Sequence, residues 1–188
     1  MPKKSMIKNV RFTKSKIALA IAAQMVFSGN VAGAPASGEI VGGIGGIEQK
    51  GTETTIIQSS DRLAIDWKSF DVGKNERVEF VQPGQSAVAL NRILGNKGTE
   101  ILGRIDANGH IILVNPRGVV FGESATINVG GLIASGLQIN PDDFMNGDLV
   151  FKRIEDSDGT VINSGMINAA SGGNVVLLGT QVENRGLI

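Results

Sequence analysis

The stretch Val161-Ile162-Asn163-Ser164-Gly165-Met166-Ile167 returns along the chain as Val182-Glu183-Asn184-Arg185-Gly186-Leu187-Ile188. The sequence positions of the matching glycines, Gly165 and Gly186, differ by 21 (186 − 165). A period of about 20 residues, with strand-forming apolar residues and Asn or Gly at corners, is typical of a β-solenoid. Asparagines at such corners can also stack as hydrogen-bonded amide ladders. This repeat therefore predicts a stack of β-helix coils.

Two weaker copies of the motif lie upstream, in 105–111 and 128–133. The positions of their glycines, Gly109 and Gly131, differ by 22 (131 − 109), which is close to one coil. The step from Gly131 to Gly165 is larger, at 34 (165 − 131), and the excess falls in the polar stretch 139–160. We expect that stretch to be an excursion from the coils, a hairpin on the outside of the helix.

The rest of the chain beyond residue 36 shows strand patterns. Leu63, Ile65 and Trp67 alternate with other residues, as in a half-buried strand, and Val175–Leu178 is a short, continuously apolar run. Since no stretch there sustains a long amphipathic helix, we predict an all-β protein. Residues 37–94 lack the repeat and are expected to form an N-terminal β cap, because a solenoid end exposes unpaired backbone. Residues 95–188 are expected to form the coils.

The N-terminus has the order of a secretory signal peptide, which we assign to residues 1–36. A basic segment without acidic residues is followed by the apolar run Ile17–Phe27 and then by small residues. The run is too short to span a bilayer, which takes about 20 residues. Cleavage after Ala34 would place Pro35 just past the bond, so the sequence favours cleavage after Ala36, with Ala34 and Ala36 in the small pockets.

Charge and composition limit the kinds of molecule that the mature domain could bind. All six basic residues of the leader precede the first acidic residue, Glu39, so 12 basic (18 − 6) and 18 acidic side chains remain. A domain this acidic repels phosphate backbones, which argues against nucleic acid as a partner. The absence of cysteine fits either a reducing compartment or export of an unfolded chain through a narrow pore.

The residues offer little for catalysis or a cofactor, and we expect neither. There is no cysteine, and His110, the only histidine, follows Asn108-Gly109 and is expected in a solvated turn. Gly42–Gly46 fits no nucleotide-binding fingerprint. The segment Glu155–Gly159 could bind an ion through Asp156 and Asp158, but it falls short of the calcium-loop pattern, and a turn is the better interpretation.

One turn motif is more specific. Asn115-Pro116-Arg117-Gly118 has the residues of a type I turn in order, between the apolar runs Ile112–Val114 and Val119–Phe121. Together with 86–93, 102–111 and 54–72, this region resembles the secretion domain of two-partner secretion exoproteins, the filamentous haemagglutinin family, and its high-molecular-weight adhesin branch in particular. The family's usual turn is Asn-Pro-Asn-Gly, so Arg117 is a departure that a type I turn accepts.

The resemblance implies a right-handed parallel β-helix with an N-terminal cap and an extra-helical sheet. It also implies a secretion signal that targets a large adhesin to a TpsB-type outer-membrane barrel through periplasmic POTRA domains, after the Sec machinery, and that nucleates folding outside the cell. The protein would then be secreted or lie on the surface of a Gram-negative bacterium. By resemblance, the transporter-recognition residues are Asn115, Pro116, Arg117 and Gly118, together with Asn91, Arg92 and Ile93.

Other interpretations stay open. The effector region could belong to a cytolysin or contact-dependent toxin, and an adhesin's host-cell or matrix carbohydrate ligand would bind beyond residue 188. A β-helix polysaccharide lyase would need clusters of acids with Arg or Lys on consecutive coils, and Arg104 with Asp106 are too few for that. Because the repeat stops at Leu187-Ile188 without a cap, we expect the chain to be a fragment of a longer exoprotein.

Overall fold

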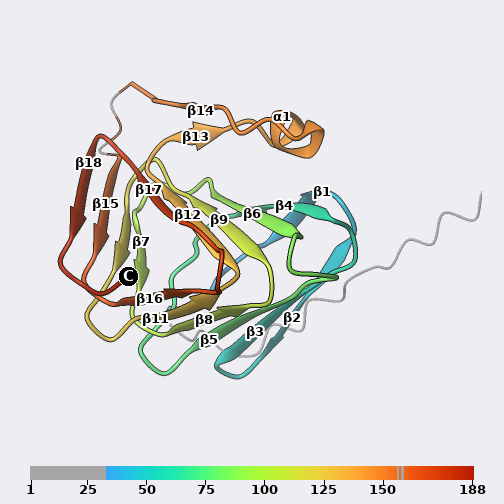
Figure 1. The fold of residues 1–188 in the computed structure, drawn as a ribbon, viewed down its shortest axis with the longest axis horizontal. Coiled ribbons are helices and arrows are strands. Elements are labelled where there is room, and N and C mark those ends of the chain that lie inside the picture. The colour runs from blue at the N-terminus through green and yellow to red at the C-terminus, as the bar shows by residue number, and fades with distance from the viewer. Residues whose placement is uncertain (1–32, 156, 158) are drawn as a thin grey trace, which may run out of the picture.

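The fold is a right-handed parallel β-helix of about five coils, as expected (Figure 1). The computed structural model describes residues 33–155, 157 and 159–188. Most of the expected leader therefore lies outside the described residues, and so do Asp156 and Asp158, on which the ion-site hypothesis rests. Among the described residues, no helix has the length and apolar character needed to cross a membrane.

Three sheets form the faces of the helix. The first contains β1 (Glu39–Gly42), β4 (Arg62–Trp67), β6 (Val88–Ile93), β9 (His110–Val114), β12 (Gly131–Ser135) and β17 (Val175–Leu178). The second contains β18 (Gln181–Asn184), β15 (Thr160–Asn163), β10 (Val119–Phe121) and β7 (Thr99–Ile101). The third contains β16 (Met166–Ala169), β11 (Thr126–Val129), β8 (Arg104–Ala107), β5 (Arg77–Val81), β3 (Glu53–Gln58) and β2 (Gly45–Lys50).

Each complete coil contributes one strand to each face, and alternate side chains point into the helix. Ile105, Ile127 and Ile167 are paired in register on β8, β11 and β16, and all three are buried in one column. Trp67 and Phe70 meet edge to face inside the first coil, with ring centroids 5.2 Å apart. Because each column is completed only by neighbouring coils, burial of apolar surface holds the stack together.

The repeat that relates Gly165 to Gly186 is confirmed in register. Val161, Ile162 and Asn163 pair with Val182, Glu183 and Asn184, and Met166 forms a bridge with Leu187. The upstream alignment was wrong by one residue. His110 pairs with Gly131, so Gly109 is matched by Gly130, whose N–H donates to the Gly109 carbonyl. Because Gly130 and Gly131 are adjacent, the sequence pattern alone allows either of them to be matched to Gly109.

Gly165 was also matched to the wrong residue. Thr126 pairs with Met166, so the residue stacked on Gly165 is Ala125, not Gly131. Gly165 has to be small because a Cβ there would lie 2.7 Å from the carbonyl oxygens of Ala125 and Gly122.

The N-terminal cap consists of β1 and β2, which pair antiparallel with β4 and β3. Parallel stacking already begins with β3 and β4, which pair with β5 and β6. The expected division at residue 94 thus cuts through the stack. The early coils show no repeat in the sequence because their lengths vary and their corners lack the Asn-Gly pattern. Val78, for example, stacks between Thr54 and Ile105, which lie at unequal sequence distances from it.

The excursion leaves the helix after β12 and returns at β15. Its strands β13 (Gln138–Ile139) and β14 (Phe151–Lys152) pair antiparallel, and α1 (Pro141–Asn146) lies between them. The Asn140-Pro141 pair starts this helix: Asn140 is its N-cap, and its side chain accepts from the N–H of Asp142. Phe144 and Ile139 cover the outer side of the first sheet, burying Ala64, Leu90 and Ile112 in a second core.

Candidate functional site

The expected turn at Asn115–Gly118 is present between β9 and β10. The Gly118 N–H donates to the Asn115 carbonyl at 2.9 Å, and Asn115 Oδ1 accepts from the Arg117 N–H at 2.9 Å. Gly118 has φ +106°, a left-handed conformation that a residue with a Cβ adopts only at a cost. Asn115 and Gly118 are thus residue types that suit their positions in the turn.

Asn115 joins three coils. Its side chain is fully buried, and Nδ2 donates to the carbonyl of Lys97 at 2.9 Å and to Thr99 Oγ1 at 3.0 Å, both on the preceding coil. Its backbone N–H donates to the carbonyl of Ser135 on the following coil at 2.9 Å. A buried amide with all these bonds is costly to replace, because its partners would be left unsatisfied.

The second expected segment alternates across β6. Asn91 points into the helix and is fully buried, and its Oδ1 accepts from Trp67 Nε1 at 3.0 Å. Ile93 is also in the core. Arg92 points outward and pairs with both carboxylate oxygens of Asp66, at 2.7 and 2.6 Å, and it donates to the carbonyl of Ile139 in the excursion. Arg92 therefore links the first sheet to the excursion.

The structure brings the two segments together. Arg92 is the register partner of Val114, the residue directly before Asn115. Of the seven residues expected from the resemblance, Asn91, Ile93, Asn115 and Gly118 are buried, whereas the side chain of Arg117 is exposed. Arg117 lies beside a shallow groove of about 640 Å³ on the outside of the second sheet, bordered also by Glu100, Thr160 and Gln181.

His110 and the expected cleavage residues lie elsewhere. His110 begins β9 and is half-buried, so it is a strand residue, not the expected solvated turn residue. Ala34 and Ala36 lie in the segment that precedes β1. Ala36 forms an antiparallel bridge with Ser69.

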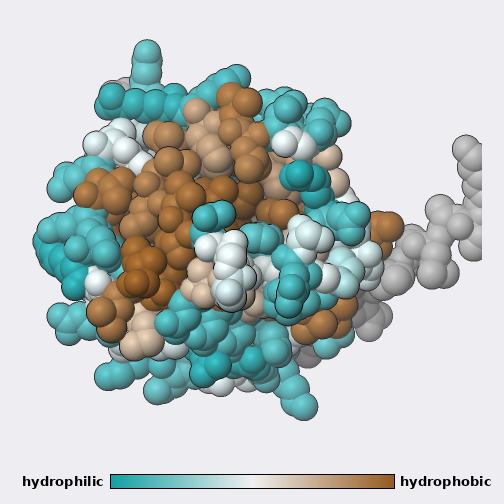
Figure 2. Space-filling model, viewed as in Figure 1, coloured by the Kyte–Doolittle hydropathy of each residue, from teal (hydrophilic) through white to brown (hydrophobic). Residues whose placement is uncertain are grey.

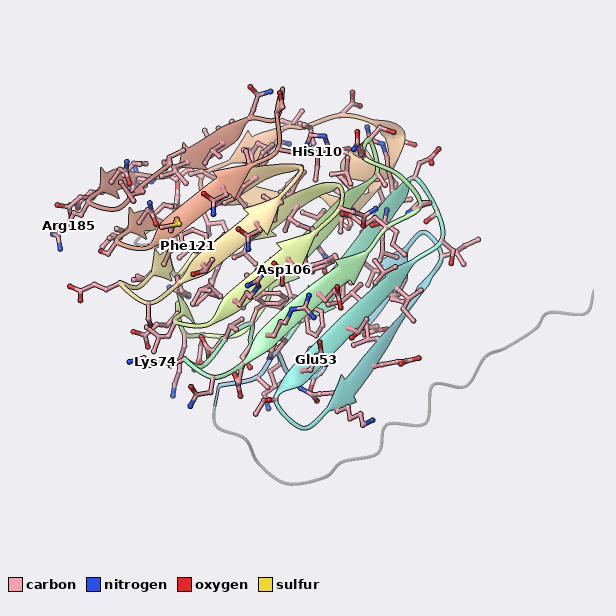
Figure 3. All side chains as sticks on the ribbon, turned by 60° about the horizontal axis from the view of Figure 1, so that its bottom comes forward. Glu53, Lys74, Asp106, His110, Phe121 and Arg185 are labelled. Atoms are coloured by element: carbon pink, nitrogen blue, oxygen red, sulfur yellow. The ribbon has the colours of Figure 1, made fainter. Side chains whose placement is uncertain are left out.

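A charged cluster that the sequence pattern did not reveal lies on the third sheet. Arg77 on β5 pairs with Glu53 at 2.7 Å, with Glu79 at 2.9 Å and with Asp106 at 2.7 Å, and Arg104 also pairs with Asp106. Figure 3 labels Glu53 and Asp106 on this sheet. The cluster spans three successive coils. In the sequence, the cluster corresponds to opposite charges two residues apart, in Arg77–Glu79 and in Arg104–Asp106. This pattern could be interpreted only once the register between coils was known.

The charges of this cluster are paired with one another. Partial burial alone would raise the pKa of Asp106, but hydrogen bonds from Arg104, Asn128 and Arg77 outweigh it and lower the pKa to about 2. The hydrogen bond to Asp106 also raises the pKa of Arg77. Each of the three carboxylates thus has an arginine partner. Across the described residues, no three His, Cys, Asp or Glu side chains come together in a way that could hold a metal ion.

Comparisons with known proteins agree over most of the chain. The family model described as "TPS secretion domain" matches residues 32–188. The chain is 38% identical, over 161 residues, to the heme/hemopexin-binding protein of Haemophilus influenzae strain ATCC 51907 / DSM 11121 / KW20 / Rd, covering 82% of this chain and 18% of that protein. A second Haemophilus influenzae heme/hemopexin-binding protein is 49% identical over 81 residues, covering 43% of this chain and 9% of the relative.

The fold has a close counterpart among solved structures. The crystal structure of the HMW1 secretion domain from Haemophilus influenzae superposes with a TM-score of 0.78 at 31% sequence identity, covering 81% of this chain and 41% of that chain. The chain thus spans less than a fifth of the full-length relative that it matches over most of its own length.

Proposed function

This chain belongs to the TPS secretion domain family, and we propose that it is the N-terminal secretion domain of a large adhesin-type exoprotein. The observation that carries the proposal is the match over residues 32–188 together with the coil stack that the HMW1 secretion domain shares. Proteins of this family are secreted with the help of an outer-membrane transporter of the TpsB type. The route that we propose runs through the Sec machinery and the periplasm to the surface of a Gram-negative cell.

The end of the coil stack supports a role in folding of the exported protein. Figure 2 views this end and shows apolar residues gathered over the last coil. Val182, Leu187 and Ile188 are exposed by 46%, 65% and 62%, and Val175 and Leu177 are half-buried. A further coil of the same polypeptide would cover this surface and pair with β16, β17 and β18. We propose that the domain folds first outside the cell and templates the coils that follow.

The burial of the motif residues bears on how the transporter would recognise the chain. Asn91, Ile93 and Asn115 present almost no surface in the folded domain. We therefore propose that the periplasmic POTRA domains bind these segments before folding, by adding an extended strand to a sheet edge. The same residues then stabilise the coils after export. Arg117 is exposed and is the member of the set that could be contacted in both states.

A second candidate concerns the effector region. Two relatives are named heme/hemopexin-binding proteins, so the protein that carries this domain could bind a heme carrier instead of a cell surface or matrix carbohydrate. The cytolysin or toxin alternative has no comparable support. The lyase alternative gains charged residues on consecutive coils, but Glu53, Glu79 and Asp106 are all paired with arginine and are poorly suited to act as a general base.

Export in the presence and absence of a transporter tests the proposal. The whole chain is produced in a Gram-negative host with and without a TpsB-type transporter, and the protein in the medium and in the periplasm is quantified. We expect the chain in the medium only with the transporter and in the periplasm without it. Equal amounts in the medium in both cells would contradict the proposed function.

A further inference from the structure

A buried carboxylate with one unused oxygen lies beside the cap. Glu76 is only 6% exposed. Its Oε2 accepts from the Gly73 N–H at 2.6 Å, whereas Oε1 is buried and has no hydrogen-bond partner among the described residues. Burying an ionised carboxylate without partners for its oxygens is costly, so this oxygen marks a place for a hydrogen-bond donor or a cation.

The segment that runs past Glu76 is 33–36. A Cβ added at Gly33 would lie 3.1 Å from Glu76 Oε2 and 3.2 Å from the Gly73 nitrogen, so the Gly33 backbone runs close to this carboxylate. Pro35 is buried, and its carbonyl accepts from Gln49 Nε2 at 3.3 Å. Ala36 exchanges backbone hydrogen bonds with Ser69 and Lys68, at 2.9 and 3.1 Å. This segment is thus held against the folded domain beside the cap.

We propose that the leader is removed at one of the two peptide bonds beside Gly33, and that Glu76 binds the α-ammonium group that this cleavage creates. Hydrolysis breaks the C–N bond, water supplies the hydroxyl of the new carboxylate and a hydrogen to the nitrogen, and the amine takes up a proton at neutral pH. The new cation would start the mature chain at Gly33 or Ala34, next to the carboxylate. The ion pair is available only after cleavage, because an amide nitrogen carries no charge.

This position differs from cleavage after Ala36, which the sequence favours. A cut there would remove Pro35 from its buried site and Ala36 from its bridge with Ser69. A cut after Gly33 places Gly33 directly before the bond, where a small side chain is expected, and it avoids Pro35 directly after the bond. Either bond beside Gly33 therefore leaves the contacts of Pro35 and Ala36 intact.

The first test determines the N-terminus of the processed protein. The chain is expressed with its leader, collected from the periplasm, and its intact mass and N-terminal sequence are measured. A start at Gly33 or Ala34 is expected. A start at Ser37, or at any residue other than those two, would overturn the proposal, because the ammonium group would then not lie beside Glu76.

The second test asks whether the ammonium and the carboxylate interact. The α-amino group of the processed protein is selectively acetylated, and thermal unfolding is compared for wild type, Glu76→Gln and the matched control Glu79→Gln. Glutamine keeps an acceptor for the Gly73 N–H but lacks the charge. Acetylation is expected to lower the unfolding midpoint of wild type and of Glu79→Gln by about 2–4 °C and to leave Glu76→Gln unchanged.

Equal shifts in all three proteins would overturn the ion pair. If Glu76→Gln does not fold, the wild-type protein still decides, since a midpoint that acetylation leaves unchanged contradicts the proposal. Neither test depends on a transporter. Failure of the ion pair is therefore distinguishable from failure of the secretion function.

Discussion

Asn163 donates from Nδ2 to Oδ1 of Asn184 at 2.8 Å, so two asparagines one coil apart form the amide ladder expected from the repeat. Asn163 is fully buried, and its own Oδ1 accepts from the Gly165 N–H at 3.1 Å. The corner of the coil is thus held by side-chain amides as well as by backbone pairing.

Replacing Asn163 should therefore cost more than replacing its partner. Asn163→Ala leaves a buried N–H without its acceptor and should lower the free energy of unfolding by about 1–3 kcal/mol. Asn184→Ala should cost less, because Asn184 is exposed and water can replace the lost bond. Urea titrations of both variants measure this difference. Equal losses would contradict this expectation, because they would show that the bond from the Gly165 N–H to Asn163 Oδ1 adds nothing to stability.

The two residues after Gly165 should differ sharply in their tolerance of charge. Ile167 is 1% exposed in the core column, whereas Met166 is 42% exposed on the outside. Ile167→Asp should cost several kcal/mol, since it buries an unpaired charge, and Met166→Asp should change stability by less than about 0.5 kcal/mol. Circular dichroism melts with limited proteolysis would detect loss of the last coils first. Identical melts for both variants would refute the coil assignment.

The Asp106 cluster predicts a defined response to acid. The pKa of Asp106 is lowered to about 2 in the folded state, below its ordinary unfolded value of about 3.9. Its contribution to stability is therefore complete above about pH 4 and is lost as the pH falls toward 2. Asp106→Asn should be less stable than wild type at pH 6, with a difference that shrinks toward pH 2. A difference that does not change over this range would contradict the pairing.

The turn motif contains a buried residue, Asn115, and an exposed one, Arg117, whose replacement should have different effects. Asn115→Ala removes the bonds to Lys97 and Thr99 and should lower both stability, by about 1–3 kcal/mol, and the amount secreted. Arg117→Asn restores the family residue on an exposed side chain and should leave both unchanged. Secretion is compared by quantifying the protein in the medium, and stability by urea titration. Undiminished secretion of Asn115→Ala would limit this residue to a structural role.

Sequence patterns predicted the fold where coils are equal in length and carry the same corner residues. Gly165 and Gly186 belong to two such coils, and their register was predictable. The coils around Val78 were not, because corner loops of different length hide the period. The six-residue helix α1 was missed because a helix so short has no periodic signal.

The candidate site was predictable only as far as the turn. The residue order of Asn115–Gly118 specifies a turn locally, but the bonds from Asn115 to Lys97 and Ser135 depend on neighbouring coils. The same holds for Arg77 with Asp106 and for the close approach of Gly33 to Glu76. These pairs join residues far apart in sequence, and no local propensity encodes them.

Transfer of export to a passenger protein tests whether residues 37–188 act as a secretion domain. Residues 1–188 are fused to a passenger, produced together with a TpsB-type transporter, and the passenger in the medium is measured. The matched control carries residues 1–36 alone before the same passenger. We expect the passenger in the medium for the first fusion and in the periplasm for the control. Retention of both fusions, or release of both, would contradict the assignment of residues 37–188 as a secretion domain.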